Sequence, residues 1–408
     1  MNAREFALQV TRKLQSAGYQ ALWAGGCVRD QLLERPPKDY DVATDANPDQ
    51  IRQLFGMGRT LAIGAAFGVI TVIGPKSAGN IEIATFRRDA DYSDGRRPDS
   101  VQFSTAEMDA QRRDFTINGL FFDPVSETVI DYVGGQADLE RRVIRAIGNP
   151  AERIAEDKLR MLRAVRFAST LEFQLDPSTI ETIQKHADEI HVVSPERISI
   201  ELQKMLLNKN RRQAVTCLLD TGLLAQILPE CQRMLKDSEL TNQVFDRLHR
   251  LKQPNFSVAL AILVEQAIPE PDDFEALCIR LKQSNEVKQC GKWILKHQHD
   301  LLRAEQSAWS KVQPLLVRPH VESLLEFLRA KHPGLPAIEF CESRLAWPAD
   351  QLNPPPLIDG DILRKHSFHP GPQYKQILDR SRQAQLDGQI TTTQQALQLA
   401  KEIVDRAN

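Results

Sequence analysis

The stretch KDYDVATD, residues 38–45, constrains the fold more than any other part of the sequence. Asp39 and Asp41 stand one residue apart in a segment that reads as a β-strand, and residues i and i+2 of a strand point to the same face. The two carboxylates are therefore expected side by side, where like charges repel unless a cation lies between them. The spacing predicts a cation site on a strand.

A glycine pair precedes the aspartates in GGCVRDQLL, residues 25–33. Gly25 and Gly26 separate an apolar, strand-like run from a helix expected to begin near Val28. Because glycine has no side chain, backbone N–H groups there can approach a phosphate, and Arg29 on the first helical turn can reach the same anion. A glycine pair alone more often marks a tight turn. Beside paired carboxylates it indicates phosphoryl or nucleotidyl transfer.

Apolar patterning divides the chain into a mixed first part and a helical remainder. Up to about residue 150, a helical pattern at 4–17 is followed by β-branched and alternating segments, which predict a mixed sheet. From about residue 151, apolar residues recur at helical spacing and strand signals nearly vanish. Proline clusters at 254–257, 268–273 and 347–360 predict joints, because proline cannot continue a helix.

The overall composition is that of an ordinary globular protein. With 408 residues, two or more packed units are expected. The six scattered cysteines argue against zinc and disulfides and for a reducing cytoplasm. No long apolar run or signal peptide is recognised, so no membrane association is expected. The net charge is −2, but basic residues gather between Arg141 and Arg166, either to meet phosphates or as a solvated helix face.

Four motifs follow one another along the chain: GGCVRD, KDYDVAT, RRDFTING and EDKLRMLRAVRF. Together they resemble the class II tRNA nucleotidyltransferases, a family that also includes the bacterial poly(A) polymerases, over roughly residues 20–205. The resemblance implies an α+β fold with a polymerase-β-like nucleotidyltransferase head, followed by an elongated all-α neck, body and tail. These four parts are expected at residues 1–150, 151–210, 211–350 and 351–408, with tRNA bound by the tail.

The resemblance assigns Asp39 and Asp41 to two Mg²⁺ ions, which hard carboxylate oxygens suit. One ion lowers the pKa of an attacking 3′-hydroxyl, and the other neutralises charge on the leaving pyrophosphate. A third carboxylate is often needed, and Glu82 in the alternating segment IEIATFR is the candidate catalytic residue. A solvent-facing strand residue is an equal alternative for Glu82.

The motif RRDFTING, residues 112–119, is expected to line the nucleotide pocket. By resemblance, Arg113 and Asp114 shape this pocket and Asn118 approaches the ribose. The adjacent arginine and aspartate also suit a buried salt bridge that holds the pocket wall, and the two interpretations are compatible. A functional role is favoured for Arg113.

EDKLRMLRAVRF, residues 156–167, is the most informative motif. On a continuous helix, Asp157 and Arg160 would lie on one face. Asp157 could accept from the exocyclic amine of cytosine or adenine while Arg160 donates to the ring, and uracil and guanine would be rejected. The alternative is an ordinary salt bridge along a helix. By resemblance, Arg163 and Arg166 also contact the nucleotide, and for Arg166 the alternative is that it faces the RNA.

Three further regions bear on specificity and support. IGAAFGVITV, residues 63–72, lacks the basic stretch of poly(A) polymerases, and residues 87–103 have the composition of the flexible loop that CC-adding enzymes shorten. In SPERISIEL, Arg197 and Glu201 are expected to brace the neck. The segment 357–379 resembles a tail in which Pro370-Gly371-Pro372 opens a helix and Lys375 holds RNA phosphate, although the local sequence alone favours a plain helix start.

The sequence therefore predicts a cytoplasmic, Mg²⁺-dependent enzyme that transfers CMP and AMP from CTP and ATP to the 3′ end of tRNA and builds its CCA terminus. Two alternatives share this chemistry. One is an A-adding enzyme that works with a separate CC-adding enzyme, and the other is a poly(A) polymerase. An inactive RNA-binding scaffold of the same fold is the alternative from a different class, and the intact aspartate pair argues against it.

Overall fold

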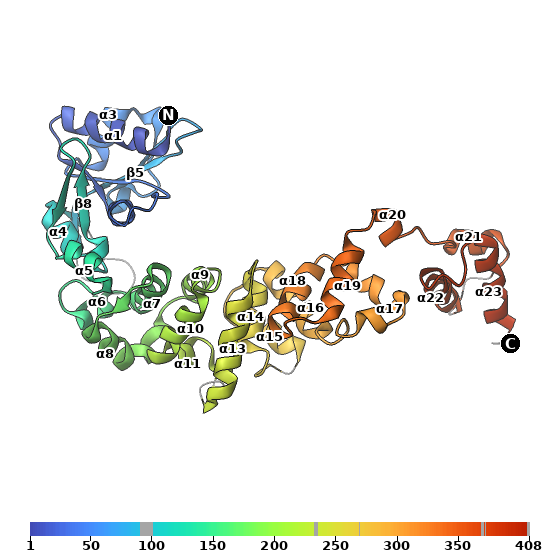
Figure 1. The fold of residues 1–408 in the computed structure, drawn as a ribbon. Coiled ribbons are helices and arrows are strands. Elements are labelled where there is room, and N and C mark those ends of the chain that lie inside the picture. The colour runs from blue at the N-terminus through green and yellow to red at the C-terminus, as the bar shows by residue number, and fades with distance from the viewer. Residues whose placement is uncertain (90–100, 232–235, 269, 369–370, 372, 406–408) are drawn as a thin grey trace. The chain divides into compact units, whose positions relative to one another are not determined.

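A computed structural model describes residues 1–89, 101–231, 236–268, 270–368, 371 and 373–405 (Figure 1). The chain forms two compact units, Met1–Lys236 and Asp237–Asn408. The first unit combines a sheet with helices, and the described part of the second is helical, so the predicted α+β class is confirmed. The finer division into head, neck, body and tail stays a prediction.

The main sheet of the first unit has seven strands in the order β3-β4-β5-β2-β1-β8-β9. Its only parallel pair among these strands is β2 with β5, so the sheet is mixed, as predicted. The strands are β1 (Ala21–Ala24), β2 (Asp41–Thr44), β3 (Thr60–Leu61), β4 (Val69–Val72), β5 (Ile81–Thr85), β8 (Leu120–Asp123) and β9 (Thr128–Asp131). Two small pairings accompany it: β6 (Arg87–Asp89) with β7 (Val101–Phe103), and β10 (Val143–Ile144) with β11 (Gln174–Leu175).

Helices α1 (Ala3–Ser16) and α3 (Pro48–Phe55) lie along one face of this sheet (Figure 1). Each begins with a reciprocal capping box, formed by Asn2 in α1 and Asn47 in α3, which satisfies backbone donors at the helix start. Beneath α1, every residue of β1 is buried and Trp23 is wholly inaccessible to solvent. This apolar packing fixes the end of the sheet at which β2 and β5 present Asp41 and Glu82.

The other helices of the first unit lie between the strands or after them along the chain. They are α2 (Gly26–Leu32), α4 (Ala106–Gln111), α5 (Gly135–Arg141), α6 (Pro150–Glu156), α7 (Leu159–Leu171), α8 (Pro177–His186), α9 (Pro195–Leu206), α10 (Arg211–Asp220) and α11 (Leu223–Ile227), with 3₁₀ turns η1 (Met57–Arg59), η2 (Ala65–Phe67), η3 (Thr116–Asn118), η4 (Ala187–Val192) and η5 (Pro229–Cys231). Helix α7 packs against α9 and α10, which stabilises the segment that carries EDKLRMLRAVRF.

The second unit is built around α14 (Phe256–Val264), whose residues are all buried. Its other helices are α13 (Ser238–Arg250), α15 (Pro271–Arg280), α16 (Asn285–His297), α17 (Trp309–Leu316), α18 (Val321–Lys331), α19 (Pro336–Leu345), α20 (Ala349–Leu352), α21 (Gly360–Lys365), α22 (Gln373–Leu386) and α23 (Thr393–Asp405), with the 3₁₀ turn η6 (Ala304–Gln306). The predicted joint at 254–257 runs into the first turn of α14, and the joint at 347–360 contains the short α20 and ends at the first residue of α21. The last three helices share a separate apolar cluster that includes Leu363 and Ile377.

Gly291 gives a test of the packing between α15 and α16. A Cβ at this position would overlap the ring of Phe274, which is wholly buried. We expect Gly291→Ala to lower the free energy of unfolding by roughly 1–3 kcal/mol, because overpacking forces side chains from their rotamers. Gly360→Ala is the matched control, since a Cβ there meets nothing within 4 Å. Equal urea midpoints for the two variants would contradict the packing.

Candidate active site

Three carboxylates gather at one end of the β2–β5 pair. Asp41 is the first residue of β2, and in the parallel register it lies opposite Glu82 of β5. Asp39 precedes the strand, so it is not itself a strand residue, but the alternation persists: Asp39 and Asp41 are exposed and Tyr40 between them is buried. The two aspartates therefore share a side of the backbone, as the sequence predicts.

The electrostatics of Asp41 confirm this proximity. Although the residue is exposed, loss of water around its carboxyl and the nearby charges of Asp39 and Glu82 together raise the pKa of Asp41 to about 6. Arg113 acts in the opposite direction. A carboxylate whose ionised form is disfavoured by two like charges would be stabilised by a bound cation.

The donor chemistry of these three residues fits a divalent cation, because hard carboxylate oxygens on neighbouring strands suit such ions. Within the described ranges, however, no set of three or more His, Cys, Asp or Glu side chains is already converged on a point where an ion could be held. The strand register thus brings the three carboxylates to one end of the β2–β5 pair. Their side chains would have to turn toward one another to ligate an ion.

The glycine turn lies beside this edge. Gly25 has φ of +69° and ψ of −122°, a backbone conformation that only glycine adopts readily. A Cβ there would lie 2.8 Å from Nη1 of Arg113. Gly26 begins α2 directly, two residues before the predicted start. The turn therefore keeps bare backbone next to a guanidinium, which is an arrangement suited to a phosphate.

A chain of buried hydrogen bonds ties α2, η3 and α7 together behind the turn. Arg29 donates to Asp30 Oδ1 at 2.7 and 2.9 Å and to Asn118 Oδ1 at 2.7 Å. Asn118 in turn donates to Asp114 Oδ1 at 3.0 Å, and Arg163 donates to Asp114 Oδ2 through Nε at 2.8 Å and Nη2 at 2.5 Å. Four residues predicted to bind the nucleotide are thus joined with Asp30 into one network.

Asp114 is the anionic centre of this network. Burial alone would raise its pKa, but the Arg163 guanidinium and the Asn118 amide outweigh burial and hold the pKa at about 2. Asn118 is 7% exposed and both of its side-chain polar atoms are engaged. It therefore braces the pocket wall, and the ribose contact that the resemblance implies stays a prediction.

Arg113 has the structural role that the sequence left open, because it links Asp109 to the backbone of Asn118. It donates to Asp109 Oδ2 at 2.9 and 3.2 Å and to the Asn118 carbonyl at 3.2 Å. Asp109, 1% exposed, also pairs with Arg112 at 2.7 Å. Sequence reasoning missed Asp109 as the anchor of both arginines. Its position three and four residues before them on a helical segment was the available signal.

Phe167, the last residue of EDKLRMLRAVRF, was also missed. Three guanidinium carbons lie near its ring centroid: those of Arg166 at 3.9 Å, Arg29 at 5.3 Å and Arg163 at 5.3 Å. Cations are attracted to an aromatic face, so one ring holds three mutually repelling guanidinium groups close together. Arg166 also forms a buried ion pair with Glu201 of α9, which supports the predicted bracing role of Glu201.

The structure corrects the predicted geometry of Asp157 and Arg160. The two residues do not share a continuous helix, because α6 ends at Glu156 and Asp157 has extended φ and ψ of −148° and 105°. Its Oδ1 instead accepts from the Leu159 N–H at 3.0 Å at the start of α7. In the sequence, Asp157, Lys158 and Leu159 continue the helical pattern. The break between α6 and α7 becomes visible only in the structure, where the Leu159 N–H donates to the Asp157 side chain.

Each of these two residues also has another partner. Asp157 pairs with Arg197 of α9 through two hydrogen bonds of 2.7 and 3.2 Å. Arg160 pairs with Glu156 and donates to the carbonyls of Arg153 at 2.9 Å and Arg112 at 3.1 Å. The simple i,i+3 salt bridge considered as the alternative is therefore absent from this described segment.

The remaining predicted positions lie elsewhere. The loop predicted at 87–103 begins and ends in the β6–β7 pair, and residues 90–100 lie outside the described residues. Lys375 is exposed in the first turn of α22, in the second unit, and Pro370 and Pro372 lie outside the described residues. All six cysteines are free thiols. No helix in the described ranges has the length and apolarity needed to cross a membrane.

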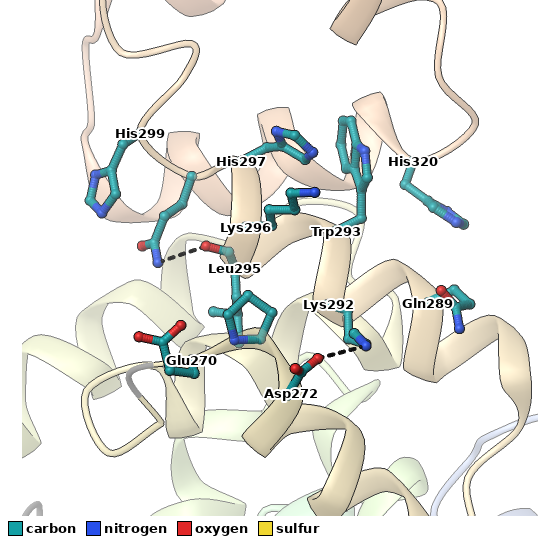
Figure 2. Close-up of a pocket in the computed structure, with 12 residues that line it drawn as sticks. Glu270, Asp272, Gln289, Lys292, Trp293, Leu295, Lys296, His297, His299 and His320 are labelled. Atoms are coloured by element: carbon teal, nitrogen blue, oxygen red, sulfur yellow. Dashed lines mark hydrogen bonds and ion pairs between the residues drawn. The ribbon is translucent and has the colours of Figure 1, made fainter.

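The second unit has a cavity of its own, of about 760 Å³, lined mainly by α16 (Figure 2). Trp293 lies between His297 and His320, at ring-centroid distances of 5.0 and 6.3 Å. Lys292 on its wall pairs with Asp272 at 2.9 Å. Its lining residues include neither a carboxylate pair on a strand nor a glycine turn, so we do not place the transfer chemistry there.

Comparison with known proteins agrees with this geometry. Residues 21–145 match the model of the Poly A polymerase head domain, and residues 172–235 match that of a probable RNA and SrmB-binding site of polymerase A. A CCA-adding enzyme of Lactobacillus delbrueckii subsp. bulgaricus is 34% identical, with 96% of each chain covered. A CCA-adding enzyme of Bacillus subtilis is 45% identical over 54% of this chain and 55% of the relative.

A solved structure extends the likeness to the fold. The CCA-adding enzyme of Bacillus stearothermophilus, crystallised in complex with CTP, matches with a TM-score of 0.81 and 28% identity over 98% of each chain. The sheet, the carboxylate edge and the glycine turn, with these matches, define a nucleotidyltransferase with a polymerase-type head. Within that class, the chain belongs to the family of the CCA-adding enzymes. Nucleotidyltransferases of this family generally use divalent metal ions.

Asp114 gives a pH-dependent test of the buried network. At pH 7, Asp114→Asn should lower the free energy of unfolding by about 2 kcal/mol, because Arg163 loses its charged partner. The folded pKa of about 2 lies below the ordinary value, so this stabilisation is complete above roughly pH 5 and is lost as the pH falls toward 2. The difference between parent and variant should therefore shrink by roughly half near pH 3.

Urea unfolding at pH 7, 5 and 3 measures these differences. Glu181→Gln, at an exposed position of α8, is the control and should show little effect at any of the three values. A difference for Asp114→Asn that stays constant down to pH 3 would be incompatible with a strongly paired carboxylate.

Proposed function

We propose that this protein is a Mg²⁺-dependent tRNA nucleotidyltransferase that adds CMP and AMP, from CTP and ATP, to the 3′ end of tRNA and completes its CCA terminus. Similarity to a CCA-adding enzyme along 96% of the chain carries this proposal, because it spans both compact units and not the catalytic head alone. In the reaction, the tRNA 3′-hydroxyl attacks the α-phosphate of the nucleotide and pyrophosphate leaves.

Asp39 and Asp41 are the proposed metal ligands, with Glu82 as the third catalytic carboxylate. Their register at the β2–β5 edge and the raised pKa of Asp41 support this assignment. Divalent ions bound there would activate the 3′-hydroxyl and neutralise charge on the leaving pyrophosphate. Mg²⁺ is the proposed ion because all three donors are hard oxygens.

The Gly25–Gly26 turn and the neighbouring arginines are the proposed triphosphate site. Gly25 is buried and its N–H donates to the Leu120 carbonyl at 3.0 Å, so the proposed phosphate donors are the N–H groups that follow it, from Gly26 at the start of α2. Arg113 lies against the turn. Arg29, Arg163 and Arg166 gather around Phe167 and add positive charge, each with a carboxylate that fixes its direction. Because these side chains are held before nucleotide arrives, binding requires little reorganisation of the protein.

Asp157 and Arg160 are the proposed readers of the base. Their contacts place an acceptor and a guanidinium donor beside the break between α6 and α7, and a base with an exocyclic amine next to a ring acceptor complements them. Uracil and guanine would set a carbonyl against the Asp157 carboxylate. Lys375, exposed in the first turn of α22, is proposed to contact tRNA phosphate. A cytoplasmic location is proposed because no disulfide joins the six cysteines.

Incubation of the full chain with Mg²⁺ and labelled CTP or ATP, on tRNAs truncated at each position of the CCA end, tests this function. We expect C to be added to tRNAs that lack it and A to be added to tRNA ending in CC. Incorporation of ATP alone, and only on tRNA ending in CC, would identify an A-adding enzyme that needs a separate CC-adding enzyme. Long A tracts on unrelated RNA would identify a poly(A) polymerase, and no transfer at all would leave an RNA-binding scaffold.

Asp41→Asn tests the carboxylate assignment. We expect turnover to fall at least about 100-fold while tRNA affinity in a filter-binding assay stays unchanged, because the substitution removes a metal ligand and no RNA contact. Asp45→Asn is the matched control, since Asp45 is an exposed aspartate of the same stretch beyond β2. Turnover retained by Asp41→Asn would refute the assignment.

A further inference from the structure

Asp157 needs support from outside its own helix. It stands in the two-residue break between α6 and α7, with extended backbone, so helix packing does not set the direction of its side chain. A side chain that distinguishes bases by one hydrogen bond must be held in place, since a loosely oriented carboxylate can turn to accommodate the wrong base. The described contacts of Asp157 show what holds it.

Two residues engage the carboxylate. Oδ1 accepts from the Leu159 N–H at 3.0 Å and from Nη1 of Arg197 at 3.2 Å. Oδ2 accepts from Nη2 of Arg197 at 2.7 Å. A carboxylate oxygen has two acceptor positions, so Oδ1 is saturated, and no other residue in the described ranges occupies the second position of Oδ2. Arg197 and Leu159 therefore leave one defined acceptor for a ligand.

The helix that carries Arg197 is itself anchored. Arg197 lies in the first turn of α9, and Glu201, one turn further along and 3% exposed, forms the buried ion pair with Arg166 of α7. Helix α9 packs against α7. The backbone that carries Arg197 is therefore held in a fixed position relative to the arginines around Phe167. The Asp157–Arg197 pair is largely shielded from water, with side-chain exposures of 16% and 21%.

We infer that Arg197 is a positioning residue for nucleotide selection, which orients the Asp157 carboxylate so that a single acceptor meets the exocyclic amine of cytosine or adenine. This inference rests on the proposed function, in which Asp157 reads the base. The bidentate pair prevents rotation of the carboxylate, so a base that presents a carbonyl at that position meets an acceptor that cannot turn away. Arg197 itself need not touch the nucleotide.

The test uses the full chain with Arg197→Met, which keeps the reach of the side chain and removes its donors, and Arg197→Lys, which keeps the charge but not the fork. Transfer to truncated tRNA is measured with CTP, UTP, ATP and GTP supplied singly. We expect Arg197→Met to reduce the kcat/KM ratios of CTP over UTP and of ATP over GTP by about tenfold or more, with a smaller reduction for Arg197→Lys.

Arg145→Met is the matched control, because it breaks ion pairs with Asp138 and Asp176 in the same unit without touching Asp157. It should leave both ratios unchanged. If Arg197→Met lowers the rate equally for all four nucleotides, the role of Arg197 is structural and the inference fails. If KM for CTP and ATP falls while selectivity holds, Arg197 competes with the base, and the inference also fails.

Two further measurements distinguish a failure of this inference from a variant that does not fold and from a failure of the proposed function. Thermal unfolding of each variant reports its fold, and should Arg197→Met not fold, unchanged selectivity in Arg197→Lys would overturn the inference while reduced selectivity would support it. Absence of transfer by the parent chain with CTP and ATP would instead reject the proposed function itself.

Discussion

The parallel pairing of β2 with β5 is the constraint on which the site depends. It sets Asp41 opposite Glu82, while the exposed–buried–exposed alternation through Tyr40 brings Asp39 to the same side. Three carboxylates on one strand edge repel one another, and desolvation together with this repulsion raises the pKa of Asp41 to about 6. The apolar strands beneath hold the three carboxylates in this arrangement. Their mutual repulsion therefore persists in the folded chain, and a bound divalent cation would relieve it.

The arginines around the site follow the opposite pattern, because each guanidinium group is paired with a carboxylate. Arg29 pairs with Asp30, Arg163 with Asp114 and Arg166 with Glu201. These pairs come from α2, α7, α9 and the segment before η3, so they also join the head of the unit to the helices that follow the sheet. Phe167 adds an aromatic surface shared by the three guanidinium groups. The arginines are therefore fixed in direction, which a site for a triphosphate needs more than it needs charge alone.

Much of the fold could be predicted from the sequence because its signals are local. The helix expected at 4–17 and the apolar, strand-like run before the glycine pair follow from periodicity, and they are present as α1 (Ala3–Ser16) and β1 (Ala21–Ala24). The carboxylate edge follows from alternation in one short strand. The break after Glu156 could not be read in this way, because residues on both sides favour helix and the Asp157–Leu159 capping bond decides the conformation.

The sequence by itself determined which chemical groups are available and how they are spaced along each strand or helix: the aspartate pair, the glycine turn and the arginines of α7. Only the tertiary structure decided which of them meet. Glu82 opposite Asp41 and Arg197 on Asp157 join residues 41 and 40 positions apart. The physical reason is that strand and helix periodicity act over a few residues, whereas partners from different elements are chosen by packing of the whole unit.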